Sequence, residues 1–100
     1  MDVLTRNYIV TMGNGQRWSI PVERIALNRA HYYAKKDGIS FDESLKEDTW
    51  PLFEADGFEI KDWARNNMNW SDVKAHAKLV DTDDFCDFQE GWVDGEVTII

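Results

Sequence analysis

The chain contains few of the residues that cross-link, interrupt or embed a protein. Its 100 residues include one cysteine, Cys86, and two prolines. A lone cysteine excludes an internal disulfide and favours a reducing cytoplasm. No segment approaches about 18 consecutive apolar residues, and residues 1–6 lack the basic and apolar regions of a signal peptide. We therefore expect a cytoplasmic protein that does not span a membrane.

Positive charge is also scarce. Eleven Lys and Arg residues oppose 19 Asp and Glu residues, for a net charge of -8. Phosphate binding needs clustered cations, so we expect neither nucleic acid nor an anionic membrane as a direct partner. What is abundant is apolar and aromatic: 43% of residues are hydrophobic, and five are tryptophan. This composition predicts one folded domain over residues 1–100.

The N-terminal third predicts a β-hairpin followed by a helix. Apolar residues alternate over 5–12, Gly13-Asn14-Gly15 supplies a turn, and residues 17–20 return as a second strand. Pro21 is expected at the first helical position, where its missing N–H costs nothing. The helix is expected to stop at Gly38.

Two further helices are predicted in the middle of the chain. Ser40 and Glu43 form a capping-box pattern, and the helix they open should kink or break at Trp50-Pro51. Asp56 should cap the next helix, which carries one stripe of residues: Ile60, Trp63, Ala64 and Asn67.

The last third mixes turns and strands. We expect turns at 70–72 and 92–95, a short acidic helix over 83–90 and a closing strand over 97–100. Residues 73–80 fit either a strand or a helix; a strand is preferred because it would pair with the hairpin.

The pattern as a whole predicts an α+β fold. The N-terminal hairpin and the C-terminal strands form a small antiparallel sheet, with helices packed on one face. One core is expected to contain Trp18, Ile20, Ile25, Tyr33, Leu45 and Trp63.

Two segments, Trp18 to Tyr33 and Asp62 to Val80, carry a resemblance. The first contains Trp18-Ser19-Ile20-Pro21 and the second contains Asp62-Trp63-Ala64-Arg65. Together they resemble small acidic proteins of tailed bacteriophages. The resemblance implies a viral accessory protein in a bacterial cytoplasm and assigns a role to no residue.

Charge is distributed unevenly along the chain. Residues 1–36 carry six cations and two anions (+4), and residues 37–100 carry five cations and seventeen anions (-12). The candidate protein-interaction face combines acidic residues with two tryptophans expected to be exposed: Asp81, Asp83, Asp84, Asp87, Glu90, Trp70 and Trp92. The alternative interpretation is a solvated surface that keeps the protein soluble.

Residues suited to catalysis or metal binding do not form a recognisable motif. His31, His76 and Cys86 lack the short spacings of a zinc site. Asp81 to Asp84 begins like a calcium loop, but Cys86 stands where that loop needs glycine. We expect no catalytic residue, no metal and no cofactor.

The leading hypothesis is therefore a small non-enzymatic protein that binds or modulates another protein. The alternative is a nucleic-acid mimic that inhibits a DNA-handling enzyme. A hydrolase is a third hypothesis, and it would need two converging carboxylates. An unpaired sheet edge would also allow a homodimer.

Overall fold

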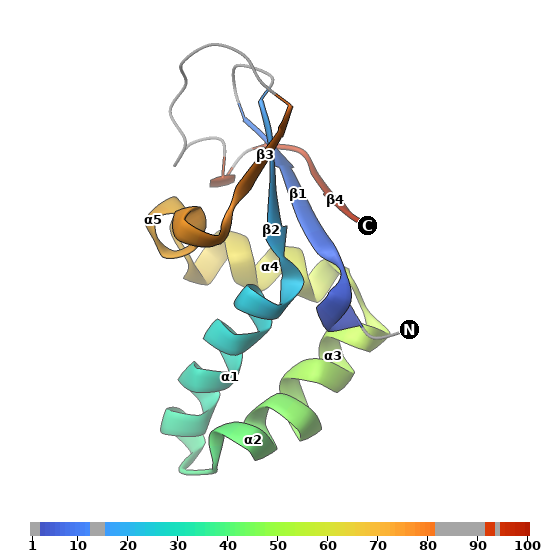
Figure 1. Cartoon of the computed structure of the whole chain (residues 1–100). Helices are drawn as coiled ribbons and strands as arrows, with labels where there is room; N and C mark the ends of the chain where they lie inside the picture. The colour runs from blue at the N-terminus through green and yellow to red at the C-terminus, as the bar shows by residue number, and fades with distance from the viewer. Residues whose placement is uncertain (1–2, 13–15, 82–91, 94) are drawn as a thin grey trace.

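The predicted hairpin forms the centre of a four-stranded antiparallel sheet (Figure 1). The computed structural model describes residues 3–12, 16–81, 92–93 and 95–100. Four strands form the sheet in the order β3-β2-β1-β4: β1 (Asn7–Thr11), β2 (Arg17–Pro21), β3 (Lys78–Asp81) and β4 (Val97–Ile99). The two C-terminal strands are thus the edges, and the predicted α+β fold is confirmed.

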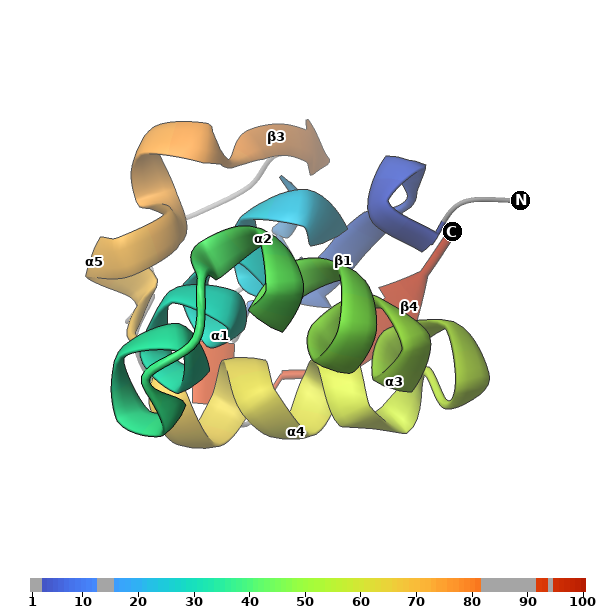
Figure 2. The ribbon, with the colours of Figure 1, turned by 90° about the horizontal axis from the view of Figure 1, so that it is seen from below.

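One face of this sheet packs against the helices. Register places Tyr8 opposite Ile20 and Val10 opposite Trp18, so these side chains share a face. Tyr8, Val10 and Ile20 are fully buried in the main core. Helices α1 (Val22–Asp37), α3 (Trp50–Ala55) and α4 (Phe58–Asn67) lie in front of the strands when the molecule is seen from below (Figure 2).

The six predicted core residues all belong to this core. Three are buried: Ile20, Ile25 and Trp63. The other three are partly buried and pack against them: Trp18, Tyr33 and Leu45.

Helix α1 ends where the sequence predicts. Gly38 follows its last turn with φ 68°, and its N–H donates to the carbonyl of Ala34. Its start differs by one position, because Pro21 is the last residue of β2 and precedes the first helical residue. Pro21 pairs with Asn7 of β1 at the end of the strand. At this position the pairing needs no backbone N–H donor, so proline is tolerated.

Of the kink or break expected at Trp50-Pro51, the break does not occur. Helix α2 (Phe41–Glu43) continues through a π-helix, η2 (Ser44–Thr49), directly into α3. The N–H of Trp50 donates to the carbonyl of Leu45, five residues earlier. This wider turn places Pro51 in the first turn of α3, where a missing N–H is tolerated. At the other end, the Ser40 hydroxyl accepts from the N–H of Glu43 at 3.1 Å, as expected.

Helix α4 has the predicted cap and most of the predicted stripe. The carboxylate of Asp56 accepts from the N–H of Phe58 at 3.0 Å. Ile60, Trp63 and Ala64 are buried. Asn67, the last residue of the helix, is exposed.

The segment after α4 is helical for longer than expected. In place of a turn at 70–72, α5 (Trp70–Val73) forms, followed by a 3₁₀ turn, η3 (Lys74–His76). The cause is a capping box in which Asp72 accepts from the N–H of Asn69 at 2.7 Å. The predicted strand over 73–80 therefore begins only at Lys78, although it does pair with the hairpin through β2. The acidic helix predicted over 83–90 lies outside the described residues.

Candidate functional site

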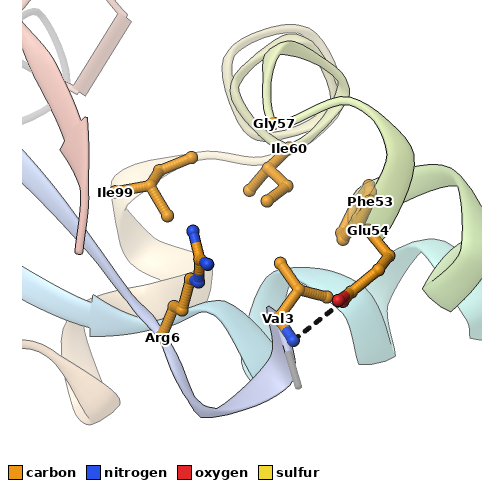
Figure 3. Close-up of a pocket in the computed structure, with 7 residues that line it drawn as sticks. All are labelled: Val3, Arg6, Phe53, Glu54, Gly57, Ile60 and Ile99. Atoms are coloured by element: carbon orange, nitrogen blue, oxygen red, sulfur yellow. Dashed lines mark hydrogen bonds between the residues drawn. The ribbon is translucent and has the colours of Figure 1, made fainter. Parts of the chain in front are cut away.

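A pocket of about 280 Å³ opens where the N-terminal turn meets the helices and the last strand (Figure 3). The turn is a 3₁₀ helix, η1 (Val3–Thr5), immediately before β1. Seven of the residues that the structure describes line the pocket: Val3, Arg6, Phe53, Glu54, Gly57, Ile60 and Ile99.

The floor of the pocket is apolar and held in place. Val3, Phe53 and Ile60 are buried members of the main core. The backbone N–H of Val3 donates to Oε2 of Glu54 at 3.0 Å, as the dashed line in Figure 3 shows. This bond ties η1 to α3 and supplies the Glu54 carboxylate with a donor.

Arg6 forms the opposite wall. Its backbone is fixed, because its N–H donates to Val3 and its carbonyl accepts from Val22. Its side chain extends between Val3 and Ile99 toward Ile60 (Figure 3). Within the described ranges, the guanidinium of Arg6 forms neither a hydrogen bond nor an ion pair. Arg6 therefore lines the pocket as a cation that is not paired with Glu54 or with any other described residue.

The outer edge of β4 adjoins this pocket. Asn7 and Ile100 exchange two backbone hydrogen bonds, and Thr11 donates to Glu96. Hydrogen-bonded and non-bonded pairs alternate in an antiparallel ladder. Val97 and Ile99, opposite Val10 and Tyr8, are consequently the residues whose N–H and C=O groups point away from β1.

The two sheet edges differ in how they are protected. The β3 edge carries the charged side chain of Lys78, and its register with β2 is interrupted by a bulge. Charges and bulges are the usual means of blocking edge-to-edge pairing. β4 contains Val97, Thr98 and Ile99, without charge or proline. The edge beside the pocket is thus the one suited to accept another strand.

Trp92 does not belong to an exposed interaction face. Its side chain is 0% exposed, and its ring lies 5.2 Å from that of Tyr8. Its indole N–H donates to the carbonyls of Ala64 and Met68, at 3.0 and 3.2 Å. Carbonyls at the C-terminal end of a helix lack helical partners. Trp92 therefore satisfies the end of α4 within the core, and the prediction that it is exposed is wrong.

Trp70 is half-buried and packs against the core. Its ring meets that of Trp18 edge-on at 5.5 Å and lies 6.4 Å from Trp92. The structure thus brings the two predicted tryptophans together at the margin of the core. Asp81 ends β3 opposite Arg17 in the register. The remaining acidic residues of the predicted face lie outside the described residues: Asp83, Asp84, Asp87 and Glu90.

A second group of cations and aromatic rings, on α1, is already paired within the fold. Arg29 donates to Asp48 at 3.1 Å and to the Thr49 hydroxyl at 2.8 Å. Its guanidinium also lies 4.6 Å from the centre of the Tyr33 ring. These contacts fasten η2 to α1, so we assign Arg29 a structural role.

The chemistry available in the pocket is limited. The described residues of its lining include one carboxylate, Glu54, and no histidine or cysteine. Across the described ranges, no three His, Cys, Asp or Glu side chains converge as metal ligands. No helix in the described part is long and apolar enough to cross a membrane.

Sequence reasoning missed Arg6. Its neighbours Thr5 and Asn7 give no sign that its side chain lines a pocket. The uncharged C-terminal strand was the available signal, because an uncharged edge strand invites pairing.

Comparisons with known proteins add no assignment. No protein-family model matches the chain, and the searches of curated proteins and of solved structures returned no significant match.

Proposed function

We propose that this chain is a non-enzymatic protein-binding protein that captures an extended segment of a partner. The segment adds to the sheet beside β4, and one of its side chains enters the pocket. The observation that carries the proposal is the unprotected β4 edge next to a preformed pocket. Strand addition of this kind gains affinity from main-chain hydrogen bonds and specificity from side-chain pockets.

The register of β4 relates the edge to the pocket. Ile99 offers its N–H and C=O outward while its side chain lines the pocket. Residues directly opposite each other in a sheet project to the same face. The partner residue opposite Ile99 would therefore direct its side chain into the pocket.

The size and lining of the pocket favour a side chain over a substrate or cofactor. Its volume of about 280 Å³ lies below the roughly 300–1,000 Å³ of small-molecule sites. Acid–base hydrolysis by paired carboxylates needs a second acid. Among the described residues, the pocket offers Glu54 alone.

The sequence supports the setting of this role. The single cysteine favours a reducing cytoplasm. The resemblance to small acidic phage proteins supports an accessory protein that modulates a host or viral partner. The acidic segment would be a second contact with such a partner.

Selection from a displayed library of random heptapeptides tests the proposed function. We expect enriched peptides to be rich in β-branched residues and to bind through the β4 edge. Val97→Pro removes an outward N–H, at the first residue of an edge strand where proline is tolerated. It should weaken binding by about tenfold or more, from the lost hydrogen bond and the blocked approach.

Val97→Ala is the matched control, because it shortens the same side chain and keeps the N–H. It should bind the selected peptides within about threefold of the parent. Thermal unfolding of both variants checks that the fold is intact. Absence of enriched peptides, or equal binding by Val97→Pro and Val97→Ala, would contradict strand addition at β4.

A further inference from the structure

We infer that Arg6 makes the pocket selective for an acidic side chain, so that the partner segment carries a glutamate opposite Ile99. The inference rests on the proposed function and adds the chemical class of the residue recognised.

The side chain of Arg6 is exposed at the pocket and has no acceptor from the protein within the described residues. Arg6 projects into the pocket from a fixed backbone. Arginine presents a planar set of donors that matches a carboxylate with two parallel hydrogen bonds. The other charged group, Glu54, already accepts from Val3 at 3.0 Å. An incoming acceptor therefore satisfies the pocket more fully than an incoming donor does.

Apolar side chains lie around Arg6 in the pocket. The guanidinium of Arg6 lies close to Ile99, with Ile60 and Val3 farther across the pocket (Figure 3). A glutamate has an aliphatic stem for these apolar side chains and a carboxylate for the guanidinium. A shorter acid or a purely apolar residue satisfies only one of the two surfaces.

The overall charge of -8 does not prevent this recognition. At physiological ionic strength the Debye length is about 8 Å, so distant carboxylates are largely screened. The charge inside the pocket is set by Arg6 and Glu54, the two charged residues among the described ones that line it.

A second copy of the chain is a poorer occupant. Symmetric pairing through β4 would present Val97, Thr98 and Ile99, none of which carries a carboxylate side chain. Arg6 would then gain no counter-ion from the paired strand, so charge complementarity favours a different, acidic partner segment.

The same heptapeptide library, selected on Arg6 variants, tests the inference. Peptides from the parent should share glutamate at one position. Selection on Arg6→Gln should lose that preference, and selection on Arg6→Glu should replace it with lysine or arginine. Arg24→Gln is the matched control, because it removes one exposed arginine from α1 and should leave the glutamate preference unchanged.

A double-mutant cycle supplies the magnitude. Replacing the shared glutamate by glutamine in the best peptide should weaken binding to the parent by about 5- to 30-fold. The same replacement should change binding to Arg6→Gln by less than about twofold. Arg6→Gln should keep the parental melting temperature, since its guanidinium has no partner in the described part of the chain.

The outcomes separate the inference from the proposed function. Peptides that depend on the Val97 N–H but show no acidic preference would overturn the inference alone, as would a glutamate preference that survives Arg6→Gln. If no peptide is enriched, both fail. Sedimentation of the parent and of Val97→Pro shows whether a second copy occupies the edge; a dimer lost only in Val97→Pro would overturn both.

Discussion

Tyr8 shows how a single residue combines opposing contributions. Its ring is fully buried and packs against Trp92 at 5.2 Å. Its hydroxyl lies close to the guanidinium of Arg65, but neither the hydroxyl nor Nε of Arg65 makes a hydrogen bond of standard geometry with the described residues. Burial raises the pKa of Tyr8 to about 12, and the positive charge of Arg65 offsets part of that rise. The ring therefore stabilises the fold while the hydroxyl adds a cost.

The raised pKa predicts a loss of stability at high pH. Below pH 10, Tyr8 is neutral in both states. Between pH 10 and about 12, the unfolded state releases the proton while the folded state keeps it, so unfolding becomes more favourable as pH rises. The contribution is about 1.4 kcal/mol for each pH unit in this window. Urea unfolding from pH 9 to 12 measures it.

Tyr8→Phe isolates this effect from other groups that titrate in the same range. This variant should lack the Tyr8 part of the slope, and at pH 7 it should be as stable as the parent or more so. Tyr32→Phe is the control. This variant should retain the parental slope, because Tyr32 is 52% exposed. Parallel pH profiles for Tyr8→Phe and the parent would contradict the assignment.

Helix ends are determined at the scale of the element. Gly38 ends α1 in the left-handed region, at φ 68°. Gly57 precedes α4 with φ -62°, which any residue adopts. A Cβ added at either position meets nothing within 4 Å. Backbone conformation is thus the difference between these two glycines.

Gly38→Ala is expected to lower the free energy of unfolding by about 1–2 kcal/mol, the cost of left-handed backbone for an L-residue. Gly57→Ala should stay within about 0.5 kcal/mol of the parent or be slightly stabilising. Urea unfolding of the pair tests this. Equal losses at both positions would show that Gly38 does not hold the left-handed conformation in solution.

Charge acts at the scale of the whole molecule. The excess of carboxylates lies in residues 37–100, and the first 36 residues are net positive. Like charges without local cations repel, so crowded carboxylates are expected to add little to stability. Their proposed value is in attracting a basic surface of the partner, separately from the pocket at β4.

Converting Asp83, Asp84 and Asp87 to Asn removes three of these charges and changes the net charge from -8 to -5. Stability should be kept or raised by up to about 0.5 kcal/mol, and the gain should shrink at high salt. Urea unfolding at low and high ionic strength measures both. Glu23→Gln is the control: Glu23 lies in the first turn of α1, so the same chemical change there should cost stability. A loss above about 1 kcal/mol in the triple variant would give these carboxylates a structural role.

Local rules account for the parts of the fold that could be predicted. The alternation that includes Tyr8 and Val10 specifies a strand with one buried face, and Gly38 specifies a helix end. The π-helix before Pro51 was not predictable from the same rules. It depends on how η2 packs on α1, where the buried Ser44 hydroxyl donates to the Ala30 carbonyl at 2.8 Å. The burial of Trp92 was not predictable for a related reason: its indole N–H donates to the Ala64 carbonyl of α4, which is distant in the sequence.

By itself, the sequence determined the hairpin, the capped helices, the closing strand and the acidic balance, because each depends on neighbouring residues or on composition. Only the tertiary structure decided that β4 lies at an edge and that Arg6, Ile60 and Ile99 meet around one pocket. These residues lie far apart in the chain, and no local periodicity relates them. These three residues come together because β4 pairs with β1 and α4 packs against the sheet. Both arrangements are favoured because they bury apolar side chains.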